Sequence, residues 1–174
     1  MAKAIELRRH TDNDDDVLTD EGVRAALELG GRLDGDYELL VSTGAQRATQ
    51  TAACLLAGLD QKVPGGVIVD TGLRSDVEDR WKQAYQDAGG GELADFRSVD
   101  PELVEQDSQR LGEALRRVLE RLGEDGRALV VGHSPSNEAA VLGLTGQEIG
   151  PLSKGEGVLI VEESDGQLRV EPLG

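Results

Sequence analysis

The sequence predicts an α/β protein: a three-layer α/β/α sandwich with a mostly parallel central sheet. Short apolar runs alternate with segments of helical periodicity along the 174 residues, which is the pattern of strands joined by helices. Residues 127–132 are apolar almost throughout, as expected of a strand buried on both faces at the centre of such a sheet. Neither a linker nor an internal repeat interrupts the alternation, so we expect a single domain over residues 1–174.

The chain is expected to begin with a strand over residues 4–9, followed by an acidic loop over residues 11–18. Thr19 has the position of a helix N-cap, and acidic residues follow it in the first predicted turn. Apolar residues at helical spacing extend this helix to Leu33.

Residues 38–42 predict the second strand and residues 67–69 the third. Between them, Thr43 and Gln46 have the spacing of a capping box. This spacing predicts a helix that opens here and runs to about Ala57.

The segment over residues 71–99 is polar, yet it contains Trp81, Tyr85 and Phe96, most of the aromatic residues of the protein. We expect one or two short helices in it. Its place in the chain, beyond the third strand, leads us to expect that it covers the functional site as a lid or substrate-selecting wall.

Helix signals recur in the second half of the chain. Asp100, as a cap, is followed by a proline at the first helical position, and this pair predicts a long helix that Gly123 ends. Ser134 and Pro135 repeat the signal after the strand over residues 127–132, and they predict a helix to about Leu142.

Two short apolar runs close the sequence, at residues 158–161 and 168–170. An Asp-Gly pair lies between them and favours a tight turn. Together they predict a β-hairpin.

The composition restricts the partners of this protein. Its 34 acidic and 18 basic residues give a formal net charge of −16, and such a field repels nucleic acid and anionic membranes, so we expect neither as a partner. The single cysteine, Cys54, rules out an intramolecular disulfide and a cysteine metal cluster. No apolar run approaches membrane-spanning length, so we expect a cytoplasmic location; the sequence leaves the oligomeric state open.

The two histidines are the strongest functional signal, because each follows a predicted strand directly. Ligands of open α/β sheets bind outside the carboxyl ends of the strands, so His10 and His133 can face one site. Arg9 precedes the first histidine, and Arg47 lies near the start of the helix after the second strand. Arginine and histidine converging at one sheet edge indicate phosphate chemistry.

The sequence of residues 7–11, Leu-Arg-Arg-His-Thr, resembles the strand and Arg-His-Gly signature of the histidine phosphatase superfamily, also called phosphoglycerate mutase-like. Further segments resemble family motifs in the same order, at residues 18–22, 42–52 and 130–133. The resemblance spans about residues 4–145. The short chain looks closest to the small branch that includes phosphohistidine phosphatases.

The expected roles follow from physical chemistry and from this resemblance. A neutral imidazole is a good nucleophile, and we assign this role to His10. Arg9 and Arg47 can each grip phosphate oxygens with a planar fork, a protonated His133 would stabilise the transferring group, and Ser134 would bind phosphate at a helix start. The resemblance implies a phosphohistidine intermediate and no metal or other cofactor.

The sequence departs from the family pattern in two places. Thr11 stands where the family has glycine, and we expect it either to tighten the pocket or to donate to phosphate. The family often has Leu-Arg-Glu after its third strand, but residues 73–75 are Leu-Arg-Ser. We assign the leaving-group acid tentatively to Asp76, with Glu78, Glu138 or no acid at all as alternatives. A site without an acid would suit a phosphoramidate.

We therefore predict a metal-independent phosphatase that acts on a small phosphomonoester or on a phosphohistidine protein. One alternative is a non-catalytic phosphate-binding or interaction protein on the same fold. Another is a phosphoglycerate mutase-type phosphotransferase, which would need more basic residues near the site; the candidates are Arg74, Arg80, Lys82 and Arg97. A third is a metal-dependent hydrolase whose ligands include aspartates of residues 12–16.

Overall fold

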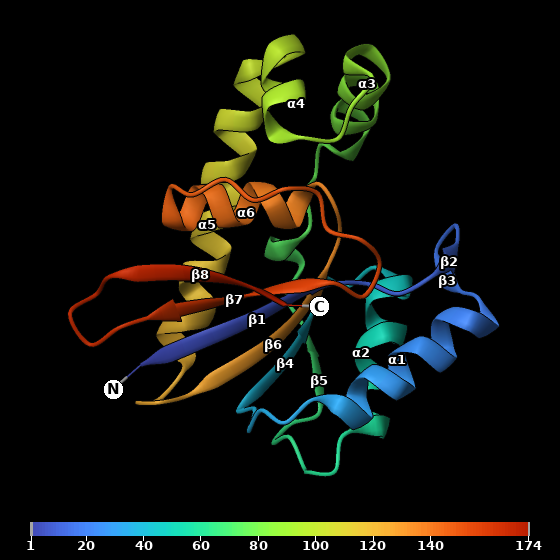
Figure 1. Cartoon of the computed structure of the whole chain (residues 1–174), viewed down its shortest axis with the longest axis vertical. Coiled ribbons are helices and arrows are strands. Elements are labelled where there is room, and N and C mark those ends of the chain that lie inside the picture. The colour runs from blue at the N-terminus through green and yellow to red at the C-terminus, as the bar shows by residue number, and fades with distance from the viewer. Residues whose placement is uncertain (1, 174) are drawn as a thin grey trace.

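The computed structural model, which describes residues 2–173, places six strands in one sheet of order β5-β4-β6-β1-β7-β8 (Figure 1). The strands are β1 (Lys3–Arg9), β4 (Leu39–Ser42), β5 (Val67–Val69), β6 (Arg127–Gly132), β7 (Gly157–Glu162) and β8 (Leu168–Leu173). Strands β5, β4, β6 and β1 pair with one another in parallel, whereas β7 and β8 form an antiparallel hairpin at one edge. The predicted fold class is confirmed, with β6 inside the parallel part of the sheet.

Helices cover both faces of this sheet (Figure 1). One face carries α1 (Asp20–Arg32) and α2 (Gln46–Gly58). The other carries α5 (Pro101–Arg121) and α6 (Ser136–Thr145), and α3 (Glu78–Ala88) and α4 (Leu93–Val99) extend this layer away from the sheet. A single 3-10 turn, η1 (Thr71–Leu73), leads into this extension. No helix of the described part of the chain is long and apolar enough to span a membrane, and the cytoplasmic location stays a prediction.

Successive side chains of each strand point to opposite faces of the sheet, and the apolar ones form two clusters, one on each face. Ile5 and Leu7 of β1 belong to the larger cluster, under α3 to α6. Leu40 of β4 and Leu129 of β6 belong to the smaller cluster, under α1 and α2. Each cluster shields one face of the parallel strands from water, which is the main stabilising contribution to such a fold.

Two helix caps are confirmed by the structure. The Thr19 side chain accepts a hydrogen bond from the backbone N–H of Gly22 (3.0 Å), and the Asp100 side chain accepts one from the backbone N–H of Leu103 (3.3 Å). Both caps satisfy N–H groups that a helix start would otherwise leave unpaired.

Two other predicted helix starts are wrong, and in both the capping hydroxyl is used elsewhere. Helix α2 begins at Gln46 without a side-chain cap, because the Thr43 hydroxyl contacts His133 instead. Helix α6 begins two residues after Ser134, whose hydroxyl donates to the Glu138 carboxylate and caps no backbone group.

The predicted acidic loop also differs from the structure, because it contains a short hairpin of β2 (Asn13–Asp14) and β3 (Val17–Leu18). Asp15 turns the chain in the left-handed region with φ of 54°. The Asn13 side chain donates to the Asp15 carbonyl (2.6 Å). Asn and Asp both favour such turns, so the polar run stabilises a hairpin here.

Helices α5 and α6 cross with almost no space between their backbones. A Cβ atom built on Gly143 would lie 1.7 Å from the carbonyl oxygen of Ser108, and one built on Gly112 would lie 2.5 Å from the carbonyl carbon of Gly143. Glycine is required at both positions, because any side chain would push the two helices apart.

A buried charge cluster surrounds Glu6, which is 1% exposed. Its carboxylate accepts hydrogen bonds from the guanidinium groups of Arg8 and Arg127 (both 2.6 Å) and from the Tyr37 hydroxyl (2.7 Å). Burial raises the pKa of Glu6, but the hydrogen bonds from Arg127, Tyr37 and Arg8 outweigh it and hold the pKa below its ordinary value.

Glu6→Gln is expected to lower the free energy of unfolding at neutral pH by about 3 kcal/mol, because it replaces the carboxylate that accepts from Arg8 and Arg127 by an uncharged amide inside a buried cluster. The folded-state pKa of Glu6 lies below the ordinary value of 4.5. Its contribution is therefore complete above that value and is lost as the pH falls through the folded-state pKa. Urea unfolding should show the difference between wild type and variant shrinking as the pH is lowered below 4.5 and through the folded-state pKa.

Glu163→Gln provides the matched control, because Glu163 pairs with Arg169 on the surface (2.8 Å). It should change the free energy of unfolding by no more than about 0.5 kcal/mol. A Glu6→Gln protein as stable as wild type at neutral pH would contradict the role of the buried cluster.

Candidate active site

The parallel register brings both histidines to the same edge of the sheet. Arg9 of β1 pairs with Gly132 of β6, so the next residues along the two strands, His10 and His133, lie level with each other. Their ring centroids are 5.4 Å apart. Strand β4 pairs with the other side of β6 and delivers Thr43 to the same place. The predicted convergence of strand ends is what the structure shows.

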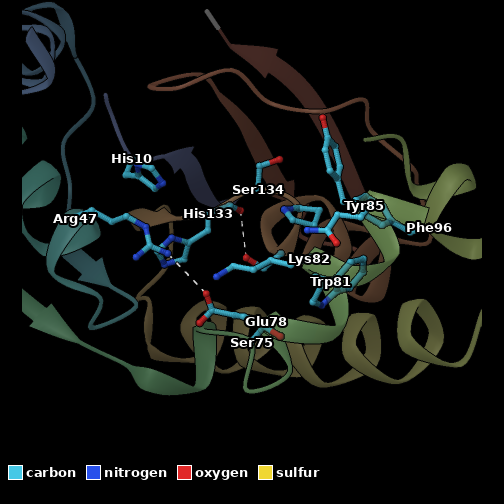
Figure 2. Close-up of a pocket in the computed structure, with 13 residues that line it drawn as sticks. His10, Arg47, Ser75, Glu78, Trp81, Lys82, Tyr85, Phe96, His133 and Ser134 are labelled. Atoms are coloured by element: carbon cyan, nitrogen blue, oxygen red, sulfur yellow. Dashed lines mark hydrogen bonds and ion pairs between the residues drawn. The ribbon is translucent and has the colours of Figure 1, made fainter. Parts of the chain in front are cut away.

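These strand ends form the floor of a cavity of about 340 Å³ (Figure 2). Its lining consists of residues from the strand ends, from the start of α2 and α6, and from α3 and α4. They are His10, Arg47, Ser75, Glu78, Trp81, Lys82, Tyr85, Gln86, Phe96, His133, Ser134, Pro135 and Ser136. The cavity therefore joins a cationic floor to a wall from the segment over residues 71–99.

One hydrogen bond fixes the protonation pattern of His10. Its Nδ1 lies 2.8 Å from the carbonyl oxygen of Thr11. A carbonyl oxygen only accepts, so Nδ1 carries the hydrogen and Nε2 keeps its lone pair. Burial lowers the pKa of His10 to about 4, with smaller contributions from the charges of Arg47, Arg9 and Lys154. At neutral pH His10 is therefore an uncharged imidazole with a free nucleophilic nitrogen.

The same charges show that the floor of the cavity is locally positive. Arg47, Arg9 and Lys154 all disfavour a further proton on His10, although the whole chain has a formal net charge of −16. A concave site with clustered cations concentrates anions locally, whatever the sign of the net charge. The floor is thus suited to a phosphoryl group.

His133 is held by the hydroxyl of Thr43, which lies 2.7 Å from its Nε2. Its Nδ1 is buried and has no hydrogen-bond partner. Burial lowers the pKa of His133 to about 3, and the charge of Arg47 adds to this. The imidazole is neutral in the absence of phosphate, and a bound dianion would favour its protonated form.

Arg47, in the first turn of α2, lines the cavity. Its guanidinium group donates to Asp16 (2.9 Å) and lies 3.7 Å from a carboxylate oxygen of Glu78 (Figure 2). Two acids thus hold the guanidinium group in place, and an entering phosphoryl group would compete with them for it.

Arg9 and Thr11 lie outside the residues that line the cavity. The Arg9 guanidinium group donates to the Leu152 carbonyl (2.8 Å), and its expected contact with phosphate stays a prediction. The Thr11 hydroxyl donates to the Gly22 carbonyl (2.8 Å) and not toward the cavity. The hydroxyl therefore has a partner in α1, and the expected contact of Thr11 with phosphate stays a prediction.

The three candidate acids occupy different surroundings. Asp76 is 74% exposed, lies 3.4 Å from Arg110 and does not line the cavity. Glu138 is buried and receives a hydrogen bond from Ser134; burial raises its pKa to about 7. Glu78 alone of the three lines the cavity. The tentative assignment of the acid to Asp76 stays a prediction, and the geometry favours the alternative Glu78, since Asp76 lies outside the cavity.

A buried carboxylate on α5 sets the position of the wall. Asp107 accepts hydrogen bonds from the Ser75 hydroxyl and from the Trp81 indole N–H, both at 2.7 Å. These bonds turn the chain after η1 so that Asp76 points outward and Glu78 points into the cavity.

Two site residues escaped the sequence analysis. Thr43 was interpreted as a helix cap, although its place directly after a strand was a signal for the site. The pairing of Asp16 with Arg47 depends on the β2–β3 hairpin, and no local pattern indicates it. Within residues 2–173 no group of three or more His, Cys, Asp or Glu side chains is arranged to hold a metal ion.

A comparison with protein families agrees with this geometry. The family model of the histidine phosphatase superfamily (branch 1) matches residues 3–157. The chain belongs to this superfamily. The resemblance inferred from the sequence is thereby confirmed, and the matched range includes both His10 and His133.

Solved structures of the same fold include enzymes with different substrates. A phosphoglycerate mutase from Bacillus anthracis str. Sterne has a TM-score of 0.76 at 20% identity, over 99% of this chain and 92% of that one. A phosphoserine phosphatase from Entamoeba histolytica, in complex with 3-phosphoglyceric acid, has a TM-score of 0.76 at 16% identity, over 99% and 97%. The protein histidine phosphatase SixA, complexed with tungstate, has a TM-score of 0.63 at 17% identity, over 98% and 96%. A comparison with curated proteins finds no significant match.

The two depressed histidine pKa values generate a prediction for NMR. Without phosphate, neither imidazole C–H signal should titrate between about pH 5.5 and 8, because the pKa values of about 4 and about 3 lie below this range. Saturating phosphate should move at least one midpoint upward, because the anion favours the imidazolium form. His10→Ala assigns the signals, since the chain has two histidines. A midpoint near 6.5 in the phosphate-free protein would contradict the buried geometry.

Proposed function

We propose that this protein is a metal-independent phosphatase that hydrolyses small phosphomonoesters through a phosphohistidine intermediate on His10. The observation that carries the proposal is the hydrogen bond from Nδ1 of His10 to the Thr11 carbonyl. It holds the imidazole in the tautomer whose Nε2 is free to attack, and His10 lines a cavity with Arg47 and His133.

In the first step, Nε2 of His10 attacks phosphorus while the bond to the leaving-group oxygen breaks. Arg47 and His133 hold the equatorial oxygens and stabilise the charge that spreads over them. In the second step, water attacks the phosphorus of the phosphohistidine and the bond between phosphorus and Nε2 breaks. Phosphate is released, and His10 returns to its neutral form. Dividing the reaction in this way replaces one difficult displacement by two easier ones.

Glu78 is the proposed proton donor for the leaving group. It is the candidate acid that lines the cavity, and its carboxylate lies 3.7 Å from the guanidinium group of Arg47. After the first step it is a carboxylate, and it can then accept the proton of the attacking water. One side chain thus serves as acid and then as base.

The cations around the cavity favour hydrolysis over a mutase reaction. Of the additional basic residues considered for holding a second acidic group of the substrate, Lys82 alone lines the cavity. The others pair with carboxylates: Arg74 with Glu78, Arg80 with Asp100 and Arg97 with Glu148. The site therefore has few groups with which to retain a phosphorylated intermediate for a second transfer.

The wall formed by α3 and α4 favours a small substrate over a phosphohistidine protein. A phosphorylated histidine on a protein surface needs an open, shallow site, whereas here the reacting groups lie at the floor of a walled cavity (Figure 2). A cavity of about 340 Å³ is of the size that encloses a small organic molecule.

His10→Ala is expected to reduce kcat/KM for 4-nitrophenyl phosphate by about 10⁴-fold, measured in excess chelator, because no other side chain replaces the nucleophile. Acid-sensitive, base-stable label from a ³²P-phosphorylated substrate should be trapped on wild type and not on the variant. Activity that chelator abolishes in wild type would refute metal independence. A folded wild type with no activity on any phosphomonoester would favour the non-catalytic binding protein.

Glu78→Gln is expected to reduce kcat/KM by about 100-fold for an alkyl phosphate, whose leaving group needs a proton. The loss should be much smaller for 4-nitrophenyl phosphate, whose leaving group departs without one. Asp76→Asn is the matched control and should change neither rate, because Asp76 lies outside the cavity. If Glu138→Gln shows this dependence on the leaving group and Glu78→Gln does not, the acid is Glu138 acting through Ser134.

A further inference from the structure

The aromatic residues of this chain are concentrated at one place. The protein has one Trp, two Tyr and one Phe; Tyr37 is buried beside Glu6, and the rest line the cavity. We call Trp81, Tyr85 and Phe96 the aromatic wall. Trp81 and Phe96 also belong to the larger apolar cluster, whose other members are aliphatic, so the aromatic side chains of this cluster gather where it borders the cavity.

Two members of the aromatic wall are fixed and one is available to a ligand. Trp81 and Phe96 are 3% and 1% exposed and pack edge to face, with ring centroids 5.1 Å apart and an interplanar angle of 82°. Tyr85 is 56% exposed, and its ring centroid lies 6.4 Å from that of Phe96. A half-exposed ring beside the fixed ring of Phe96, which Trp81 holds in turn, offers a flat apolar surface to a ligand in the cavity.

Lys82 lies between the aromatic wall and the cationic floor. It comes from the same face of α3 as Glu78 and Tyr85, and Figure 2 shows its side chain extending along the cavity toward Glu78 and His133. Within the described residues it has no ion pair or side-chain hydrogen bond. The one carboxylate lining the cavity, Glu78, is bonded to Arg74 (2.6 Å). The Lys82 ammonium group is therefore free to bind an anion of the substrate.

We infer that the substrate is an aromatic phosphomonoester whose leaving group carries a carboxylate close to the phosphoester. This inference rests on the proposed function. The phosphoryl group lies on the floor with His10 and Arg47, the carboxylate contacts Lys82, and the aromatic ring lies against Tyr85 of the aromatic wall. The order of these groups in the substrate follows the order of the side chains in the cavity.

Three phosphonates, which cannot be hydrolysed, separate the contributions of the parts of the cavity. Methylphosphonate contacts the floor alone, benzylphosphonate adds a ring, and α-carboxybenzylphosphonate adds the carboxylate. Trp81 is the single tryptophan of the chain and lines the cavity, so its fluorescence reports binding, with calorimetry as a second measurement. We expect the ring to tighten binding roughly tenfold and the carboxylate to tighten it a further fivefold or so.

Variants assign each increment to a residue. Tyr85→Ala should abolish the increment from the ring, whereas Tyr85→Phe, which keeps an aromatic ring, should retain it. Lys82→Gln should abolish the increment from the carboxylate and leave that from the ring, and Lys82→Arg should retain both.

Three results would overturn the inference. One is equal affinity, within about twofold, for the three phosphonates. Another is a gain in affinity from the ring that persists in Tyr85→Ala, or a gain from the carboxylate that persists in Lys82→Gln. The third is a Lys82→Gln substitution that weakens the binding of methylphosphonate as much as it weakens the binding of the carboxylated compound, because the lysine would then contact the phosphoryl group. The hydrolysis of 4-nitrophenyl phosphate and its loss in His10→Ala test the proposed function separately, so the two ideas can fail independently.

Discussion

The parallel pairing of β1, β6 and β4 is the constraint on which the rest of this molecule depends. Because β1 and β6 are paired so that Arg9 is opposite Gly132, the two imidazoles emerge side by side although 123 positions separate His10 from His133 in the numbering. A slip of one residue in either strand would turn one imidazole to the opposite face of the sheet. The apolar clusters on both faces oppose such a slip, so the packing of the core also fixes the positions of the two imidazoles.

A second theme is how an acidic protein maintains a site for an anion. Positive groups in and near the floor are paired with protein carboxylates: Arg47, which lines the cavity, with Asp16 and Glu78, and Lys154, which lies outside the lining, with Asp12 (3.1 Å). These acids stabilise the guanidinium and ammonium groups in a concave, partly desolvated place. In the proposed reaction, a phosphoryl group would compete with these acids for Arg47, so that binding would exchange one set of charged contacts for another.

Sequence reasoning was successful wherever the deciding interactions are local or follow from strand periodicity. His10, His133 and Arg47 could be placed at the sheet edge because each follows a strand closely, and the strands themselves have clear apolar patterns. It could not place Asp76 relative to the cavity, because the direction of the chain there depends on the bond between Ser75 and Asp107, 32 positions apart. It could not place the Thr11 hydroxyl for the same reason, since its partner is a carbonyl of α1. Partners supplied by another element leave no mark in the local sequence.

The attachment of α3 to Asp107 has a consequence for binding kinetics. Asp107 is 4% exposed and accepts hydrogen bonds from Ser75 and Trp81, so the wall is anchored to the long helix α5 before any ligand arrives. A pre-organised wall loses little conformational entropy when a ligand binds. Association then need not wait for a closing motion, and ligands of different affinity should differ chiefly in how long they stay bound.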